Sequence, residues 1–320
     1  KKLSNKKFLI TGGAGFIGAN IAKYLLQQKA VKVRILDNLS NGYYSNIKEF
    51  ENHPNFEFVE GDITNLETCQ KAVDDMDVVL HQAALGSVPR SINDPIRSND
   101  ANINGFLNML VAIKDSKKKP RMVYAASSST YGDHPDLPKE EDKIGKPLSP
   151  YAVTKYVNEL YADVFAKTYN MELIGLRYFN VFGPKQSPSG AYAAVIPLFM
   201  QALKEEKAPT INGDGEQTRD FTFVENAVQA NIKAALAPLE ATGEVYNIAF
   251  GERISLNQLW EELQKISGKE LQAKYGPPRP GDVRDSLADI AKARRLLDYQ
   301  PEYSVKNGLQ KAWDYFIKHQ

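Results

Sequence analysis

Short, mostly apolar runs alternate with longer stretches of helical periodicity through the first half of the chain. We expect these runs to form buried strands, at 8–10, 33–36, 56–59, 78–80, 122–125 and 173–176. The stretches between them repeat apolar residues at helical spacing, at 17–28, 66–73, 102–113 and 152–168. Buried strands that alternate with helices are typical of a parallel sheet covered on both faces. The pattern therefore predicts an α/β fold with a doubly wound parallel sheet of the Rossmann type.

The pattern changes after about residue 180, where Pro184, Pro188 and Gly190 mark a loop. The later elements are shorter and mixed, with helices expected near 192–204, 225–236, 255–266 and 304–318 and strands near 209–211, 220–223 and 245–248. We predict a sheet domain of residues 1–180, which later returns of the chain join, and a smaller mixed α/β part of residues 181–320. Because no low-complexity linker separates them, the two parts should pack tightly.

Composition excludes several classes of protein. The 320 residues include 42% hydrophobic and 25% charged residues, with a net charge of +1, so nothing favours nucleic acid or an anionic membrane as a partner. No apolar run approaches the roughly 20 residues that span a bilayer, and residues 1–7 lack the apolar core of a signal peptide. We therefore expect a cytoplasmic protein. The single cysteine, Cys69, cannot form an internal disulfide, and the histidines show no metal-ligand spacing, so no metal site is expected.

A glycine-rich turn directly follows the first strand. Gly12, Gly15 and Gly18 have the spacing G-x-x-G-x-x-G, and Gly13 with the last two also fits G-x-G-x-x-G. Glycine permits the sharp turn, the approach of backbone to a pyrophosphate and the close packing of the next helix on the sheet. The N-terminus of that helix then faces the phosphates with N–H groups and a favourable dipole. The turn therefore predicts a dinucleotide-binding site.

Two acidic residues refine this prediction. Asp37 ends the second strand, 19 residues after Gly18, where a carboxylate can bind the ribose hydroxyls. A carboxylate there would repel a 2′-phosphate, so the pattern favours NAD over NADP. Asp62 follows the third strand, and we expect it to lie beside the adenine.

Tyr151 and Lys155 are four residues apart, so a helix would place them on one face. We expect the ammonium to lower the pKa of the phenol, so that the tyrosine accepts a hydroxyl proton while hydride leaves the same carbon for the nicotinamide. Ser127 ends the fifth strand, at the edge where open α/β sheets bind ligands, and could relay a proton to Tyr151. Together these residues predict redox chemistry at a carbon that bears a hydroxyl.

These motifs and several others, taken in chain order, resemble the extended short-chain dehydrogenase/reductases that act on nucleotide sugars. The resemblance covers essentially the whole chain, and its further segments are His81–Ala84, Ser127–Gly132, Arg177–Pro184 and Arg219–Phe221. Within that family the chain is most similar to bacterial UDP-N-acetylglucosamine 4-epimerases of surface-polysaccharide pathways, through Leu85–Arg90 and Ala125–Pro135.

The resemblance implies a role for individual residues. The implied NAD contacts are Gly12, Gly15, Phe16, Ile17, Gly18, Asp37, Asn38, Asp62, Ile63, Ala83, Ala84, Asn102, Tyr151, Lys155 and Tyr178. The residues implied to face the sugar and the first phosphate are Gly86, Ser87, Ser127, Ser128, Tyr151 and Asn180. The UDP site is implied to comprise Ala194, Val195, Asn212, Arg219, Arg253, Arg279 and Asp282.

The resemblance also separates the chemistries of the family. Nucleotide-sugar 4,6-dehydratases carry an Asp-Glu pair directly after the position of Ser127, whereas Ser128 and Ser129 stand here and cannot act as that acid and base. This favours reversible C4 epimerisation through a 4-keto sugar, with NAD kept bound. Ser286 stands where some epimerases have a bulky tyrosine, which leaves room for an N-acetyl group and favours UDP-GlcNAc and UDP-GalNAc.

Three alternatives remain open at this point. The substrate could be a UDP-N-acetylhexosaminuronic acid or the UDP-Glc and UDP-Gal pair, and the protein could be an NAD-sensing module without turnover. The family commonly dimerises through two long helices of each subunit, so a homodimer held by a helical bundle is expected. The helices concerned would carry Phe106, Leu110, Leu160 and Val164, which could equally be core residues.

Overall fold

The computed structural model describes residues 3–319. Its centre is a seven-stranded sheet in the order β11-β6-β5-β4-β1-β2-β3, and every pairing in it is parallel. The strands are β1 (Lys7–Thr11), β2 (Lys32–Asp37), β3 (Phe56–Glu60), β4 (Val78–His81), β5 (Arg121–Ser127), β6 (Leu173–Tyr178) and β11 (Glu244–Ile248). From β1 the chain first adds β2 and β3 on one side and then β4 on the other, so the direction of winding reverses between β1 and β4. Ligands are expected at the carboxyl ends of the strands at such a point. The predicted doubly wound sheet is thus confirmed.

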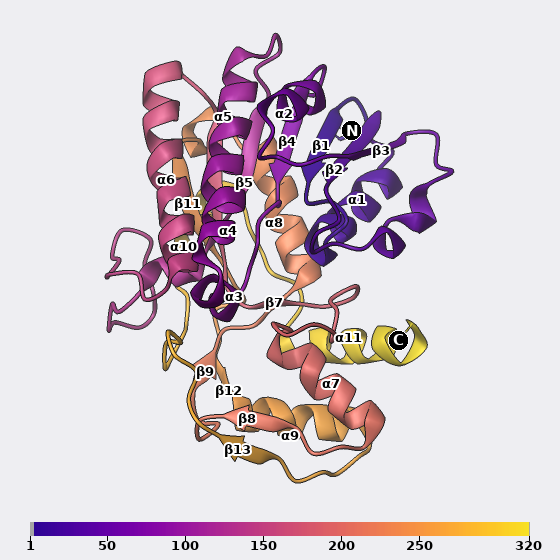
Figure 1. The fold of residues 1–320 in the computed structure, drawn as a ribbon, viewed down its shortest axis with the longest axis vertical. Helices are drawn as coiled ribbons and strands as arrows, with labels where there is room; N and C mark the ends of the chain where they lie inside the picture. The colour runs from indigo at the N-terminus through magenta and orange to yellow at the C-terminus, as the bar shows by residue number, and fades with distance from the viewer. Residues whose placement is uncertain (1–2, 320) are drawn as a thin grey trace.

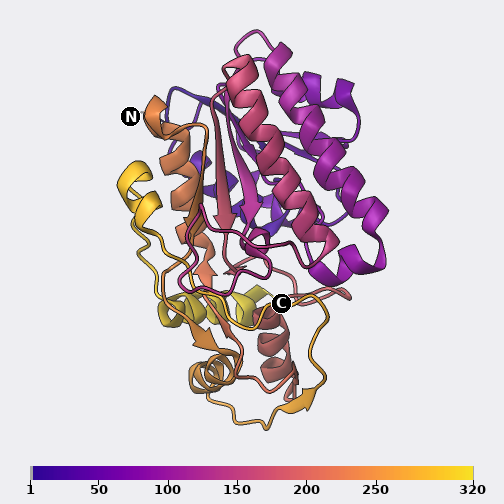
Figure 2. The ribbon, with the colours of Figure 1, turned by 90° about the vertical axis from the view of Figure 1, so that its left-hand side faces the viewer.

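Helices cover both faces of the sheet, as Figures 1 and 2 show. Alternate residues of β1 enter two different cores, Phe8 and Ile10 on one face and Leu9 on the other. The first face packs against α1 (Phe16–Gln27), α8 (Val224–Leu236) and α10 (Ala291–Leu297). The second packs against α2 (Leu66–Val73), α5 (Gly105–Asp115) and α6 (Pro150–Tyr169).

The smaller part lies beyond the carboxyl ends of the sheet strands and has its own apolar core (Figure 1). Its helices are α7 (Val195–Glu205), α9 (Leu256–Ser267) and α11 (Val305–His319). Its strands are β7 (Val181–Phe182), β8 (Thr210–Asn212), β9 (Thr218–Arg219), β10 (Thr222–Phe223), β12 (Ile254–Ser255) and β13 (Lys274–Gly276). β11, α8 and α10 return to the first part, so the smaller part is assembled from several separate segments.

The region before α5 differs from the expected helix over 102–113. Two short helices, α3 (Val88–Asn93) and α4 (Pro95–Asn99), are followed by a π-helical turn, Asp100–Asn104, from which α5 continues. The chain also forms single 3₁₀ turns at Tyr44–Asn46, Lys48–Phe50, Ser128–Tyr131 and Leu239–Ala241. Among the described residues, no helix combines the length and apolarity that crossing a membrane requires.

Candidate active site

A cavity of about 1090 Å³ opens along the carboxyl ends of the sheet strands. Its walls come from the turns after β1, β2, β3, β4 and β5 and from the N-terminal half of α6, and the segment 185–194 closes it from the smaller part. The structure therefore brings the glycine-rich turn, the serine run and the Tyr151–Lys155 pair to one hollow, although they are far apart in the sequence.

The glycine-rich turn has no room for side chains, because a Cβ at two of its positions would collide with the protein's own backbone. Gly12 has φ +67°, and a Cβ on it would lie 2.7 Å from the Ala83 nitrogen. A Cβ on Gly18 would lie 2.5 Å from the Gly12 oxygen. No side chain caps the N-terminus of α1, so its first N–H groups have no side-chain acceptor, and the residues that carry them, Phe16 to Gly18, line the cavity. The turn is thus a bare backbone cradle at a helix N-terminus, which suits a pyrophosphate.

Asp37 holds this cradle in place. Its carboxylate accepts hydrogen bonds from the Ala14 nitrogen at 3.0 Å and the Leu39 nitrogen at 2.8 Å, and it lines the cavity. Burial raises the pKa of Asp37, against the effect of the two backbone donors. Each carboxylate oxygen retains acceptor capacity for a ribose hydroxyl. Asp62, on the same side, orders its own turn by accepting from Thr64 and Asn38.

The predicted catalytic pair lies on the first two turns of α6. Ser149 caps this helix through the Ala152 nitrogen and Pro150 is its first residue, which fixes where the helix begins. The Lys155 Nζ donates to the Ala125 oxygen of β5 at 2.9 Å, and burial lowers the pKa of the Lys155 ammonium to about 8. Tyr151 is held by its own nitrogen, which donates to the Ser91 Oγ at 2.9 Å. Both side chains line the cavity beside Ser127.

The expected direction of the Tyr151 pKa is wrong for the protein as it stands. Burial raises the pKa of the Tyr151 phenol, and the hydrogen bond that opposes this comes from the Ser127 side chain. The physical reason is geometric, because the Lys155 ammonium is directed at the Ala125 carbonyl. Ser127 is itself oriented by Ser129, whose nitrogen and Oγ contact the Ser127 Oγ at 3.1 and 2.8 Å. In this structure the serine, more than the lysine, assists ionisation of the phenol.

A closed ring of hydrogen bonds supports the floor of the cavity. The Tyr178 hydroxyl donates to the Gln82 Oε1 at 2.8 Å and accepts from the Asn231 Nδ2 at 2.8 Å, and the Gln82 Nε2 donates to the Asn231 Oδ1 at 3.2 Å. Tyr178 and Gln82 line the cavity, whereas Asn231 lies buried on α8 behind them. The sequence pattern included Gln82 in the segment His81–Ala84 without a role for it, and it did not single out Asn231, because the ring joins three distant segments.

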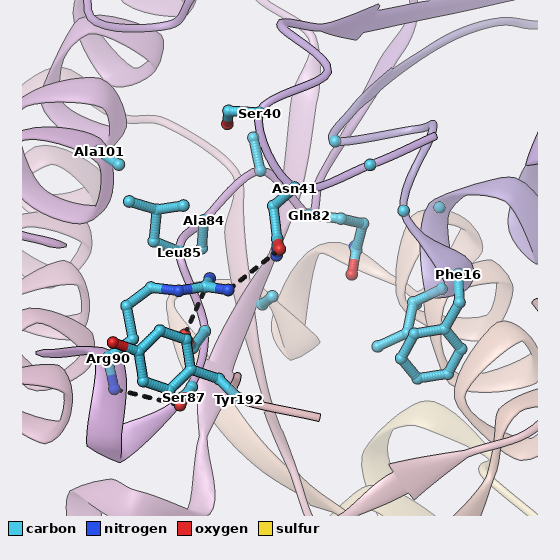
Figure 3. Close-up of a pocket in the computed structure, with 18 of the residues that line it drawn as sticks. Phe16, Ser40, Asn41, Gln82, Ala84, Leu85, Ser87, Arg90, Ala101 and Tyr192 are labelled. Carbon is cyan, nitrogen blue, oxygen red and sulfur yellow. Dashed lines mark hydrogen bonds between the residues drawn. The ribbon is translucent and has the colours of Figure 1, made fainter. Parts of the chain in front are cut away.

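Arg90 forms part of another wall of the cavity, together with Asn41 and Tyr192, as Figure 3 shows. Its guanidinium donates to the Asn41 Oδ1 at 3.1 Å and the Gly86 oxygen at 3.2 Å, and it lies over the Tyr192 ring at 5.1 Å. Tyr192 in turn accepts from the Asn93 Nδ2 at 3.0 Å. These contacts join the turn after β2, helix α3 and segment 185–194. Sequence reasoning quoted Arg90 within a motif but gave it, Asn41 and Tyr192 no role.

Most of the predicted cofactor and sugar residues line this one cavity. They are Gly12, Gly15, Phe16, Ile17, Gly18, Asp37, Asn38, Asp62, Ile63, Ala83, Ala84, Gly86, Ser87, Ser127, Ser128, Tyr151, Lys155, Tyr178, Asn180 and Ala194. Asn102 does not line it. This residue is 2% exposed and acts from behind, accepting from the Leu85 nitrogen and donating to the Leu85 oxygen and to Thr154.

The remaining predicted UDP residues form a second group in the smaller part. Arg219 donates to the backbone oxygens of Val283 and Arg284, and β9 pairs with β12, next to Arg253. Asp282 and Arg279 lie close enough to Arg219 to affect its pKa, which burial lowers. Arg253, Arg279 and Asp282 are exposed.

Three other predicted substrate residues, two from the UDP site and Ser286 from the sugar site, do not line the cavity. Val195 begins α7, directly after the cavity residue Ala194. Asn212 ends β8, where it pairs with Gly276. Ser286 is 6% exposed, and its nitrogen donates to the Thr218 oxygen at 3.1 Å. The second group adjoins the cavity at α3, where Gly281 packs against Val88.

The fold and the site together define a class, the dinucleotide-binding enzymes with a tyrosine–lysine pair on a helix beside a parallel sheet. A family model described as GDP-mannose 4,6 dehydratase matches residues 9–312, and the chain belongs to that family.

Solved structures of UDP-sugar 4-epimerases are similar to this chain over almost its full length. The UDP-N-acetylglucosamine 4-epimerase of Methanobrevibacter ruminantium, in complex with UDP-N-acetylmuramic acid, is 37% identical with a TM-score of 0.93, over 99% of this chain and 100% of that one. The UDP-glucose 4-epimerase of Thermotoga maritima, with UDP-glucose, is 35% identical with a TM-score of 0.90, over 98% and 99%. The UDP-glucuronic acid 4-epimerase of Bacillus cereus, with UDP-glucuronic acid and NAD, is 34% identical with a TM-score of 0.90, over 98% and 99%.

Proposed function

We propose that the protein is a UDP-sugar 4-epimerase that interconverts UDP-GlcNAc and UDP-GalNAc. The observation that carries this proposal is the convergence of Tyr151, Lys155 and Ser127 in the cavity that also contains the glycine-rich turn. Similar structures of UDP-sugar 4-epimerases contain sugar nucleotides of three kinds, which supports the reaction class.

The cofactor is NAD. The bare cradle at Gly12–Gly18 suits a pyrophosphate, and Asp37 disfavours a 2′-phosphate at the ribose. When bound, NAD would supply reversible hydride transfer from and to the sugar C4. The protein supplies the cavity, the proton acceptor and the contacts that hold the diphosphate while the 4-keto sugar turns.

Within this cavity each catalytic side chain has one task. Tyr151 accepts the C4 hydroxyl proton and gives it back after the sugar has turned. Ser127 bonds the phenol and lowers the cost of its ionisation, and Ser129 keeps the Ser127 hydroxyl directed at it. Lys155 holds positive charge beside the site from its anchor on Ala125. Ser128 and Ser129 provide no carboxyl group for elimination of water, which argues against the dehydratase reaction that the family model is named for.

The choice of an N-acetylated sugar rests on two observations. The structure that is 37% identical is that of a UDP-N-acetylglucosamine 4-epimerase. The position of Ser286 holds a small side chain, although in this structure it lies buried beside Thr218, outside the cavity lining. The proposed contacts of the UDP moiety are Arg219, Arg253, Arg279 and Asp282.

The test is a panel of five sugar nucleotides, UDP-Glc, UDP-Gal, UDP-GlcNAc, UDP-GalNAc and UDP-glucuronic acid. We expect the purified protein, without added cofactor, to form UDP-GalNAc from UDP-GlcNAc at the highest kcat/KM of the panel. A higher kcat/KM for UDP-Glc or UDP-glucuronic acid would correct the substrate and keep the reaction class. Failure to form any C4 epimer would reject both, and would favour the NAD-sensing module.

We also propose that the protein forms a homodimer through α6. Leu160 and Val164 on this helix are 48% and 55% exposed, and Val153 on the same helix is 46% exposed. Phe106 and Leu110, which were candidates for the same interface, are buried in the core of the subunit. A second copy that presents the same face would cover this apolar stripe and give a helical bundle.

A further inference from the structure

A buried carboxylate without a cation lies where the smaller part meets the sheet domain, since its neighbours Ala288 and Tyr299 belong to the core on one face of the sheet. Asp220, between β9 and β10, is 0% exposed. Its Oδ1 accepts from the Phe250 nitrogen at 3.1 Å and the Gly251 nitrogen at 3.3 Å, and its Oδ2 accepts from the Gly251 and Ala288 nitrogens, both at 3.1 Å. No ion pair among residues 3–319 includes Asp220. Burying a carboxylate without a counter-ion is costly, so the backbone contacts must be what retains it.

The two segments that Asp220 joins are the ones that carry the second group of the site. Phe250 and Gly251 form the turn between β11 and β12, and Arg253 lies two residues further on. Ala288 ends the segment that runs from Arg279 through Asp282 and Ser286.

Arg219, the residue before Asp220, binds the same segment from the other side. Its guanidinium donates to the Val283 oxygen at 2.8 Å and the Arg284 oxygen at 3.1 Å. Arg219, which ends β9, thus binds the backbone carbonyls of the segment 279–288, and Asp220, which follows it, binds backbone N–H groups of that segment and of the turn 250–253. This arrangement fixes where three arginine-bearing segments lie relative to one another.

We propose that Asp220 is a positioning residue for the nucleotide diphosphate, which sets the turn 250–253 and the segment 279–288 against Arg219. This inference rests on the proposed function, which assigns the UDP moiety to Arg219, Arg253, Arg279 and Asp282. Asp220 contacts neither the cavity at the sheet edge nor the residues around Tyr151. Its removal should therefore weaken sugar-nucleotide binding and raise KM, with cofactor retention unchanged and kcat affected less than KM.

The charge state of Asp220 should make the affinity for the sugar nucleotide depend on pH. Burial, with a smaller contribution from the Glu252 carboxylate, raises the pKa of Asp220 to about 7 against the opposing effect of the backbone N–H donors. The other titratable group that faces it is Tyr299, whose hydroxyl donates to the Ala249 oxygen and whose pKa burial raises well above its usual value, so it stays neutral. A protonated carboxyl has lost acceptor capacity on one oxygen and cannot keep all of these backbone contacts. Binding that needs the ionised form should therefore weaken as the pH falls through about 7.

The experiment measures UDP-GlcNAc affinity by calorimetry between pH 6 and 8 on the NAD-loaded protein. Both phosphates of this ligand are esterified, so its own charge stays constant over the range. Because about a tenth of Asp220 is ionised one pH unit below its pKa, we expect the dissociation constant to be about tenfold larger at pH 6 than at pH 8. Asp220→Asn should bind about tenfold more weakly than the wild type at pH 8, and its affinity should not change with pH.

Asp214→Asn is the matched control. Asp214 lies in the same part and pairs with Arg284 at 2.8 Å, but it is exposed and its pKa is lowered by that pairing. This variant should keep the wild-type affinity and its pH profile. If Asp220→Asn does not fold, the pH dependence of UDP-GlcNAc affinity in the wild type and in Asp214→Asn still tests the inference. A wild-type affinity that stays constant from pH 6 to 8 would overturn it. So would an Asp220→Asn protein that binds like the wild type. Binding is read from the intact ligand, so failure to form an epimer would count against the proposed function alone.

Discussion

Tyr151 and Lys155 lie in the first two turns of α6, and desolvation moves their pKa values in opposite directions. It raises the pKa of the phenol and lowers the pKa of the ammonium to about 8. Burial therefore favours the neutral form of both groups and moves the two pKa values apart, so by itself it opposes the proton-acceptor role of the tyrosine near neutral pH. Ser127 contributes the hydrogen bond that favours the phenolate.

Replacing Tyr151 with phenylalanine tests this role. We expect Tyr151→Phe to lower kcat for C4 epimerisation by a factor on the order of 10²–10⁴, because the group that takes the hydroxyl proton is gone. The helix should remain intact, since the residue is anchored by its backbone nitrogen on Ser91. Chromatography of the two epimers measures the rate. Tyr156→Phe, five residues further along α6, should leave kcat unchanged; an equal loss in both variants would refute the assignment.

At this scale the sequence predicted which residues meet but not how they interact. The spacing of Tyr151 and Lys155 and the position of Ser127 were enough to predict one cavity. The effect of Lys155 on the phenol depends on the direction of Nζ, which is set by the Ala125 carbonyl on a different element. Sequence reasoning assigned no role to Gln82, Asn231 or Arg90 for the same reason, because their roles arise from contacts between distant segments.

At the scale of elements, the turn between β1 and α1 positions the proposed cofactor site by its close approach to the turn after β4. Gly12→Ala would place a Cβ 2.7 Å from the Ala83 nitrogen at φ +67°, so both the strand end and the turn after β4 would have to move. We expect this variant to lose bound NAD. The absorbance of the purified protein in the nicotinamide bands, and the cofactor released on denaturation, measure this.

Gly243→Ala is the control for backbone strain. Gly243 has φ +78°, and nothing lies within 4 Å of a Cβ built on it. In each variant the left-handed backbone conformation of the new alanine costs roughly 1–2 kcal/mol of stability. The two variants therefore differ only in the collision of the new Cβ, which occurs at Gly12 and not at Gly243. Retention of NAD by Gly12→Ala at the level of Gly243→Ala would show that the close approach is not required.

The longer elements were predictable because their periodicity extends over many residues. The six predicted strands of the first part and its four helices all exist, with boundaries within a few residues except at 102–113. There the π-helical turn at Asp100–Asn104 precedes α5, and a local change of helical type leaves no periodic signal. Two-residue strands such as β7 and β9 depend on partners elsewhere in the chain, so the sequence did not predict them.

At the scale of the whole molecule, the exposed apolar face of α6 predicts the assembly. Leu160→Asp would place a charge in the proposed dimer interface, and we expect it to shift the protein from dimer to monomer in analytical ultracentrifugation at micromolar concentration. Leu239→Asp, at a residue that is 66% exposed on a 3₁₀ turn, should leave the mass unchanged. A wild-type protein that sediments as a monomer, or a Leu160→Asp protein that remains a dimer, would reject this interface.

The arrangement of the two parts is what the sequence could least predict. The resemblance grouped Arg219, Arg253 and Arg279 with Ala194 in one UDP site, but Ala194 alone of these lines the cavity in this structure. Where the arginines lie depends on the Asp220 contacts and on the packing of Gly281 against Val88, both of which join segments far apart in the chain.

The central claim is that C4 of the sugar is oxidised and then reduced within one cavity, with cofactor and sugar held throughout. UDP-GlcNAc deuterated at C4 tests it directly, when it is converted in ordinary water without added cofactor and the UDP-GalNAc is analysed by mass spectrometry and NMR. We expect the deuterium at C4 of the product, because the sugar and the cofactor stay together between the two transfers. Loss of the label to solvent would contradict it.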